Sequence, residues 1–303
     1  MLDETVWVDT PAREPAERDR LFRESPWEIA ERIALGLAWR LKPERIAGVP
    51  ELAWLHAKEL VAPRRDLPDP EATLRTVPNI AGIAHDLSVP TLVAAYSRGL
   101  YPLSHVLTPK WQSPPVRCVL FYQDAHISKR FRPVLRQDHF RITFDRAFDR
   151  VMAACADRRG RRLHLTWITP RIMRAYSALH EAGYAHSFEA WNKDGELVGG
   201  GYGFAVGRSF ALESMFCFED NSSKVGFTWL NWHLSKSGFE FTDNRQVAPY
   251  KLQLGFKPMP RSEFLGYLAE ALRGPTKLGR WEVEADAATI AAWKPEAGRP
   301  VQG

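Results

Sequence analysis

The sequence predicts an α+β fold in which helices pack on a mostly antiparallel sheet. Apolar residues recur with helical spacing on both sides of residues 186–218, whereas that central stretch shows successive strand patterns. Hydrophobic residues make up 45% of the 303 positions, and 11 Trp, 8 Tyr and 16 Phe supply large side chains for a core. We therefore expect a folded globular protein.

The first helix is predicted at residues 26–42. Ser25 and Glu28 have the spacing of a capping box, and a proline takes the first helical position between them. Residues 43–80 contain six prolines and one short helical candidate near residues 51–60. We interpret this stretch as a connector that wraps the main body.

Capping residues and glycines delimit the next elements. Ser88 can cap a helix that Gly99 ends, and Thr169 can cap a helix that Gly183 ends. With the apolar spacing, these signals predict helices over residues 88–99, 145–156 and 170–182, and a strand at residues 118–121.

The central stretch predicts an antiparallel meander with a turn at Asp194 and Gly195. The elements expected from here onward are strands at 186–191, 196–206 and 210–218, a helix at 222–236, a strand at 239–242 that reaches Asp243, and a helix at 261–272. Residues 274–303 are expected to form a loosely attached tail.

Charge is distributed unevenly along the chain, whose net charge is +5. Residues 1–75 carry 12 basic and 15 acidic side chains, whereas the remainder carries 29 and 21. The densest basic stretch, residues 129–162, contains Lys129, Arg130, Arg132, Arg136, Arg141, Arg146, Arg150, Arg158, Arg159, Arg161 and Arg162. Such a stretch can contact phosphates, and a solvated helix face with a loop is the alternative interpretation.

The three cysteines, Cys118, Cys155 and Cys217, are too few and too scattered for a disulfide framework or a zinc site. They favour a reducing, cytoplasmic location. The N-terminus lacks the features of a signal peptide, and no apolar run approaches the roughly 18 residues that a membrane span needs. We expect neither secretion nor a membrane partner.

A glycine-rich strand and two carboxylates are the strongest local signals of a site. Four glycines lie in residues 199–203, which indicates either a groove in which a ligand approaches the backbone or a bulge. Glu213 stands in an apolar strand, so it faces solvent or is buried with a partner. Asp243 follows an apolar strand, where a catalytic carboxylate and a turn-forming Asp are both common.

Several chemistries have no sequence signal here. Phosphate-binding glycine loops, the H-E-x-x-H zinc motif and the G-x-S-x-G nucleophile motif are missing, and the nine histidines are dispersed. Nucleotide hydrolysis, metal catalysis and Ser/His hydrolysis therefore lose support, and neither a metal nor a cofactor is expected.

Eight segments in order resemble the leucyl/phenylalanyl-tRNA–protein transferase family. They cover roughly residues 76–270 and read Tyr96-Ser97-Arg98-Gly99-Leu100-Tyr101-Pro102, Trp111-Gln112-Ser113-Pro114, Thr166-Trp167-Ile168-Thr169, residues 179–187, residues 197–203, Glu213-Ser214-Met215-Phe216, Ser223-Lys224 and Leu254-Gly255. The ordered series is far more specific than any one of its members.

The resemblance implies an N-acetyltransferase-like (GNAT-like) C-terminal domain that does not use acyl-CoA, with a smaller N-terminal domain. The expected division is a helical extension at 1–75, a small domain at 76–117, the aminoacyltransferase domain at 118–273 and the tail at 274–303. Such enzymes move Leu, Phe or Met from an aminoacyl-tRNA to the N-terminal Arg or Lys of a protein, and the product is a degradation signal.

The resemblance also assigns expected roles. The aminoacyl ester is already activated, so the protein must hold two substrates together and remove a proton from the attacking amine. The Glu matching Glu213 lines the donor site, and the Asp matching Asp243 helps to organise proton removal. The expected substrate-binding residues are Trp111, Trp167, Tyr176, Gly201, Phe210, Met215, Ser223 and Arg245, and the expected tRNA-binding residues are Lys129, Arg130, Arg132, Arg158, Arg159, Arg161 and Arg162.

The chain departs from the family pattern at several positions. The family has D-x-Q after the strand, but here Arg245 stands in the Gln position and Gln246 follows one place later. A one-residue bulge would restore Gln246, which is therefore a third catalytic candidate, although the default alternation points it the other way. Gly201 replaces a Met of the donor pocket, so we expect extra volume there. Leu103 replaces a Trp, Pro249-Tyr250 and Gln253 replace family polar residues, and residues 1–75 have no family counterpart.

Three functions follow as hypotheses. The first is transfer from charged tRNA to a protein with a basic N-terminus, and the second is transfer to a small-molecule amine. The third is a non-catalytic tRNA-binding relative, which Arg245 favours and the intact Glu213 and Asp243 disfavour.

Overall fold

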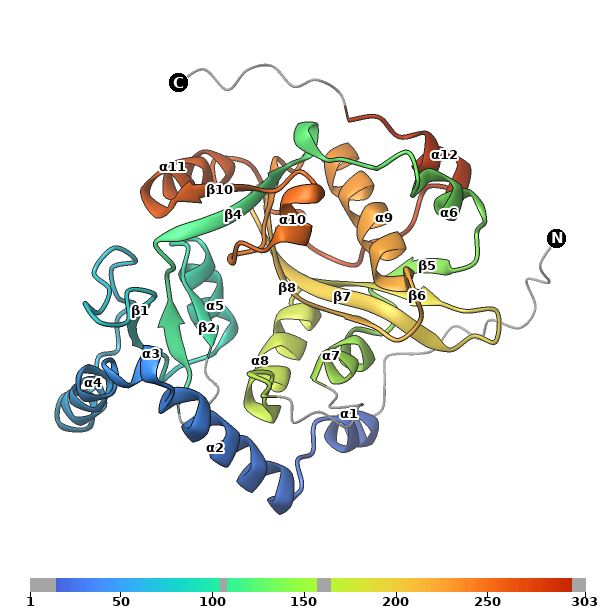
Figure 1. Ribbon diagram of the computed structural model, residues 1–303. Helices are drawn as coiled ribbons and strands as arrows, with labels where there is room; N and C mark the ends of the chain where they lie inside the picture. The colour runs from blue at the N-terminus through green and yellow to red at the C-terminus, as the bar shows by residue number, and fades with distance from the viewer. Residues whose placement is uncertain (1–14, 104–107, 157–164, 296–303) are drawn as a thin grey trace.

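A computed structural model describes residues 15–103, 108–156 and 165–295 (Figure 1). The helices are α1 (Pro15–Leu21), α2 (Pro26–Arg40), α3 (Pro43–Ile46), α4 (Val49–Val61), α5 (Val89–Tyr96), α6 (Arg132–Arg136), α7 (Phe148–Ala156), α8 (Pro170–Glu181), α9 (Ser222–Lys236), α10 (Pro249–Gln253), α11 (Arg261–Ala271) and α12 (Ala287–Ala292), with a 3-10 turn, η2 (Tyr122–Asp124). The strands are β1 (Ile80–Ile83), β2 (Tyr101–Leu103), β3 (Lys110–Gln112), β4 (Val116–Phe121), β5 (Arg141–Phe144), β6 (Ala185–Trp191), β7 (Leu197–Val206), β8 (Ser209–Cys217), β9 (Phe241–Asp243) and β10 (Lys257–Pro260).

Seven strands form the main sheet, in the order β10-β4-β9-β8-β7-β6-β5. Neighbouring strands are antiparallel except β8 and β9, which run parallel. The predicted meander is confirmed as β6-β7-β8, with Gly195 in the left-handed conformation at its first turn. A smaller sheet, β1-β3-β2, lies beside the main one. The α+β class with a mostly antiparallel sheet is therefore confirmed.

Helices cover both faces of the main sheet. In Figure 1, α9 lies on one side of β6 and β7, and α7 and α8 lie on the other. Each face has its own apolar core, one with Phe188, Phe210 and α9, the other with Tyr176, Tyr202 and α7. Because the glycines of β7 carry no side chain, neighbouring side chains such as Phe188 and Phe210 pack close to its backbone.

Several predicted helix ends are confirmed. Ser25 and Glu28 form the full capping box of α2, and Thr169 caps α8 by accepting from the Ile172 N–H. Gly183 follows α8 with a positive φ of 81°, the conformation that glycine adopts readily.

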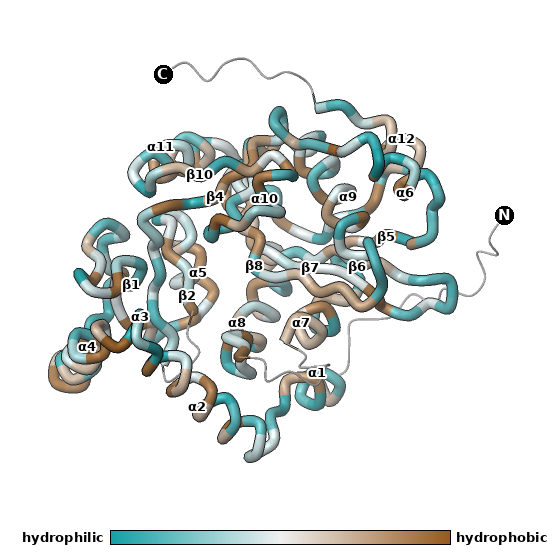
Figure 2. Tube along the Cα trace, viewed as in Figure 1, coloured by the Kyte–Doolittle hydropathy of each residue, from teal (hydrophilic) through white to brown (hydrophobic). Residues whose placement is uncertain are grey.

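The N-terminal helices expose much of their apolar surface. Ile33 and Leu37 of α2 are 42% and 50% exposed, and Trp54 of α4 is 71% exposed. Figure 2 shows apolar residues on the outside of α4, at the periphery of the molecule. Within the described residues, no helix is both long and apolar enough to cross a membrane.

The prediction of a loosely attached tail is wrong for residues 274–295. Trp281 is 3% exposed and stacks on His186 at a centroid distance of 3.6 Å, while its backbone N–H donates to Asp145 at 2.8 Å. Arg132 binds the other end of this segment, because its Nη1 donates to the carbonyls of Ala291 and Trp293 at 2.5 and 3.1 Å. Burial of the Trp281 ring therefore holds residues 274–295 on the main body, although this segment contains little regular secondary structure.

Candidate active site

A bulge in β8 positions Glu213. Tyr202 of β7 pairs with Ser214, but the next residue, Gly203, pairs with Leu212, so Glu213 is left without a cross-strand partner. An extra residue of this kind re-aims its side chain and often lies near a functional site. The side chain of Glu213 has no exposed surface, so it is buried.

Asp243 ends β9 between β4 and β8, where it pairs with Val119 and Ala211. Arg117 of β4 binds it with two donors: Nε lies 3.3 Å from Oδ1, and Nη2 donates to Oδ2. Arg117 Nη1 also donates to the carbonyl of Gly99 at 2.9 Å. Both side chains are at most 4% exposed, so this is a buried ion pair fixed in a bidentate geometry.

Arg245 connects the two carboxylates. Its backbone has a φ of +55°, and its N–H donates to Asp243 Oδ1 at 2.9 Å. Its Nη2 forms an ion pair with Glu213 Oε1, and its guanidinium carbon lies 3.7 Å from the centroid of the Tyr101 ring. Asp243 and Glu213 therefore belong to one buried network.

Two tyrosines complete the network. The Tyr96 hydroxyl donates to Glu213 Oε1, contacts the Tyr176 hydroxyl and accepts from Arg245 Nη2 at 3.1 Å. Burial raises the pKa of Tyr96 well above its usual value and that of Tyr176 to about 12. Both hydroxyls are therefore neutral at pH 7 and can donate hydrogen bonds.

Three buried polar atoms at this network have no hydrogen-bond partner among the described residues: Glu213 Oε2, Arg245 Nε and the Tyr202 hydroxyl. Unsatisfied buried polar atoms are costly and uncommon in folded proteins. Their concentration around one ion pair indicates a place where a polar group can bind.

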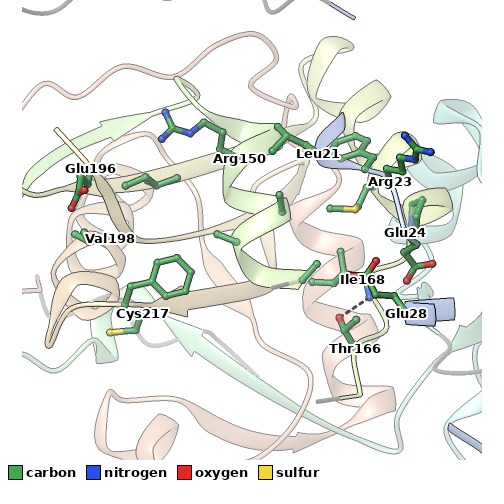
Figure 3. Close-up of a pocket in the computed structure, with 18 of the residues that line it drawn as sticks. Leu21, Arg23, Glu24, Glu28, Arg150, Thr166, Ile168, Glu196, Val198 and Cys217 are labelled. Carbon is green, nitrogen blue, oxygen red and sulfur yellow. Dashed lines mark hydrogen bonds between the residues drawn. The ribbon is translucent and has the colours of Figure 1, made fainter. Parts of the chain in front are cut away.

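One cavity borders the network, whereas a larger cleft is lined by none of its residues. The cavity, of about 20 Å³ and close to the volume of one water, is bordered by Asp243, Arg117, Tyr96 and Tyr101. The cleft, of about 1110 Å³, lies between the α1–α2 connection, α7, the start of α8, and the ends of β7 and β8 (Figure 3). Glu213 lines neither of them.

The large cleft has mixed walls. Leu21, Arg23 and Glu24 of the N-terminal extension line it together with Arg150 and Ile168 of the main body (Figure 3). Thr166 and Ile168, which border the cleft, flank Trp167, and the Trp167 ring meets Tyr176 edge-on at 6.4 Å. Trp167 thus lies in the chain between two residues that line the cleft, and its ring contacts Tyr176 of the buried network.

The structure brings together only part of the predicted catalytic and substrate-binding set. Asp243, Glu213, Arg245 and Tyr176 share the buried network, and Trp167 packs on it. Gln246 is exposed, and its carbonyl accepts from the Lys251 ammonium at 2.7 Å, so no bulge turns Gln246 toward the network.

The expectation of extra volume at Gly201 is wrong. A Cβ added there would lie 2.7 Å from Met215 Cγ, Phe188 Cε1 and the Ser214 carbonyl. Phe210 is 1% exposed and packs on Trp281 on the same face as α9. These side chains fill the region as core.

Other predicted residues lie elsewhere. Trp111 is buried in β3 of the small sheet, and Ser223 is half-buried at the start of α9. Lys129 and Arg130 are exposed just before α6. Arg132 binds the C-terminal segment, so its guanidinium has a structural role that the prediction of tRNA contact missed. Arg158, Arg159, Arg161 and Arg162 lie outside the described residues.

Arg117, Tyr96 and Tyr101 were not among the predicted site residues. A charged residue inside the apolar strand of residues 116–121 is itself a signal of a buried partner, because an unpaired buried charge is costly. Within the described residues, no group of three His, Cys, Asp or Glu side chains could hold a metal ion.

The chain resembles one family of proteins throughout its main body. The family model described as leucyl/phenylalanyl-tRNA protein transferase matches residues 119–269. Among curated proteins, the leucyl/phenylalanyl-tRNA–protein transferase of Desulfatibacillum aliphaticivorans is 41% identical over 72% of this chain and 93% of its own length. The protein of the same name from Pseudomonas syringae pv. syringae is 41% identical over 74% and 96%.

A solved structure, that of L-PGS from Bacillus licheniformis, matches with a TM-score of 0.29 and 11% identity, covering 55% of this chain and 58% of the other. A likeness at that level carries no argument about the fold.

Proposed function

This chain belongs to the leucyl/phenylalanyl-tRNA–protein transferase family, and we propose that it transfers Leu, Phe or a similar amino acid from charged tRNA to the N-terminal Arg or Lys of a protein. The reaction joins the α-amine of the acceptor to the carbonyl carbon of the aminoacyl ester and releases the ribose hydroxyl. The supporting observation is the buried network in which Arg245 joins Asp243 to Glu213.

The proposed donor site lies around Glu213, Tyr96 and Tyr176, with Trp167 at its edge. Aromatic surfaces suit a terminal adenosine and an apolar amino-acid side chain, and buried donors and acceptors orient the ester. Asp243 is the proposed organiser of proton removal, through the Arg117 guanidinium and the Arg245 backbone that it holds in place.

The proposed tRNA contact is the exposed basic surface before α6, where Lys129 and Arg130 lie. Phosphate contacts of this kind supply affinity that falls with salt concentration. An N-acetyltransferase-like topology, the divisions at residues 75 and 117, and a cytoplasmic location, where charged tRNA is found, form part of the same proposal.

The direct test is transfer of labelled Leu or Phe from charged tRNA to a peptide that begins with Arg. We expect label in the peptide and none in the same peptide with an acetylated N-terminus, because acetylation removes the nucleophile. Failure to transfer from any aminoacyl-tRNA would refute the enzyme proposal. Transfer to small amines but not to peptides would favour the alternative in which the acceptor is a small-molecule amine.

A non-catalytic tRNA-binding relative is the second candidate, because arginines pair with both carboxylates in this structure. Asp243→Asn separates the two. If the protein is an enzyme, we expect turnover to fall by about 100-fold or more while tRNA binding is retained. Tight tRNA binding by a wild type without turnover would favour the binder.

A further inference from the structure

The site around Arg245 contains more positive than negative charge. Two carboxylates, Glu213 and Asp243, face three cations, which are Arg245, Arg117 and Lys251. Lys251 of α10 donates to the carbonyls of Asn244 and Gln246 at 3.1 and 2.7 Å. Burial lowers the pKa of Lys251, and the two carbonyls accept from its ammonium.

The remaining titratable groups near Arg245 are neutral at pH 7. Burial raises the pKa of Tyr96, Tyr101, Tyr176 and Tyr202, which come from α5, β2, α8 and β7. Burial also raises the pKa of Cys118, the thiol on β4 near Lys251 and Asp243. The formal charge of the cluster is therefore one positive unit.

The ion pair between Arg245 and Glu213 also leaves two atoms unused. One donor, Nη2, meets one acceptor, Oε1, whereas Nε and Oε2 are buried without a partner. A bidentate pair would join all four. A group that both donates and accepts would satisfy the two remaining atoms, and a neutral amine is such a group. An ammonium only donates, so it cannot accept from Nε.

We propose that Arg245 makes this site select the unprotonated form of the attacking amine. The inference rests on the proposed function and deepens it by naming a specificity-determining residue. Charge and hydrogen bonding both favour the neutral form. An ammonium beside Glu213 would be repelled by the Arg245 guanidinium, whereas a neutral amine would accept from Arg245 Nε and donate to Glu213 Oε2.

The chemical steps balance. The acceptor ammonium releases one proton to solvent as it enters. The neutral nitrogen then attacks the ester carbonyl, the new C–N bond replaces the C–O bond to the ribose, and the second amine proton ends on the ribose oxygen. In this scheme, Asp243 need not act as the final proton acceptor, which fits its two-donor pairing with Arg117.

The test is the pH dependence of kcat at saturating peptide, which reports ionisations in the enzyme–substrate complex. A free α-amine has a pKa near about 7.7–8.0. In the wild type, we expect the acid limb of the kcat–pH profile to have an apparent pKa below that range. In Arg245→Gln, it should move up by about one pH unit or more, because a bound ammonium is no longer repelled.

Companion variants control for charge and structure. Arg245→Lys keeps the charge and should move the limb much less than Arg245→Gln. Glu213→Gln increases the net positive charge of the cluster and should lower the apparent pKa of the acid limb. The double variant Arg245→Gln/Glu213→Gln has the wild-type net charge, so its apparent pKa should return close to the wild-type value. Arg273→Gln removes an exposed arginine of a helix end and should leave the limb unchanged.

The outcomes are distinguishable. If the wild type transfers amino acids but Arg245→Gln leaves the limb in place or lowers it, this inference is wrong and the proposed function stands. An equal shift in Arg245→Lys and Arg245→Gln would likewise refute it. If the wild type transfers nothing at any pH, both this inference and the proposed function are wrong. Should Arg245→Gln fail to fold, the shift in Glu213→Gln decides.

Discussion

Glu189 is a buried carboxyl that the proposed reaction does not use. It lies in β6 and accepts from Ser187 Oγ and Thr143 Oγ1, both at 2.5 Å, and from the Ala147 N–H at 3.2 Å. Burial raises its pKa to about 7, against these hydrogen bonds, which lower it. The folded protein therefore holds a proton that the unfolded chain releases near pH 4.5.

The sign of the pH effect on stability follows. Because the folded pKa exceeds the unfolded value, the contribution of Glu189 is fully present below about pH 4.5 and is lost as the pH rises to about 7, at a cost of about 3 kcal/mol. In Glu189→Gln, this loss should disappear. Urea unfolding at pH 5 and pH 8 measures it, and Glu270→Gln, an exposed residue, is the control. Equal pH dependence in wild type and Glu189→Gln would contradict the assignment.

The two carboxylates of the candidate site show what sequence can predict for single residues. Glu213 and Asp243 stand out because a charge in an apolar strand needs a partner, and both are buried and paired. The identity of the partner was not predictable. Arg245 reaches Glu213 only after its backbone enters the left-handed region, and alternation along an ideal strand does not include that turn.

At the scale of elements, the glycines of β7 make room for neighbours. Gly201 lies between Phe188 and Met215, the residues paired with it on β6 and β8. Gly201→Met should therefore strain the sheet and lower the free energy of unfolding by about 1–3 kcal/mol. Gly266 of α11 has no heavy atom within 4 Å of an added Cβ, so Gly266→Ala should raise it by about 0.5–1 kcal/mol. Urea titrations measure both, and a stabilised Gly201→Met would show that the core can repack.

Period-two and helical patterns predicted the long elements, including the meander and α9. They did not predict β1, β2 and β3, because three or four residues are too short for a periodic signal. The bulge at Glu213 also has no sequence mark, since it arises from how β7 and β8 pair. Sequence therefore singled out Glu213 and Asp243 as buried, paired carboxylates, but it identified neither Arg117, Tyr96 and Tyr101 nor the geometry of the network.

At the scale of the whole molecule, the described segments before and after the region that the family model matches both contribute to the core. Trp281 contacts His186 and Phe210 and lies in the core on the α9 face. We expect Trp281→Ala to cost about 3–5 kcal/mol of folding stability, whereas Trp54→Ala, which truncates an exposed side chain, should cost little. Thermal and urea unfolding compare the two. Equal effects of the two substitutions would mean that packing of the C-terminal segment does not contribute to folding stability.

The N-terminal extension is anchored by α1, which precedes the residues that the family model matches. Arg18 forms ion pairs with Asp149 of α7 at 2.9 Å and with Glu181 of α8 at 2.6 Å. Phe22, directly after α1, is 1% exposed in the core on that face and also borders the large cleft. One wall of the cleft thus depends on how firmly this residue docks.

Phe22→Ala should release that wall without unfolding the main body. Loss of the buried ring costs about 3 kcal/mol or more, which corresponds to about 100-fold faster hydrogen exchange of amides in α1 if they open with the anchor. Exchange in β7 should not change, because its hydrogen bonds belong to the central sheet. Trp27→Ala, at the second residue of α2, is the matched control, since Trp27 is 77% exposed. If α1 amides exchange equally in wild type, Phe22→Ala and Trp27→Ala, the anchor does not hold the extension. Faster exchange throughout β7 would mean instead that extension and body unfold as one unit, so that the cleft wall could not move alone.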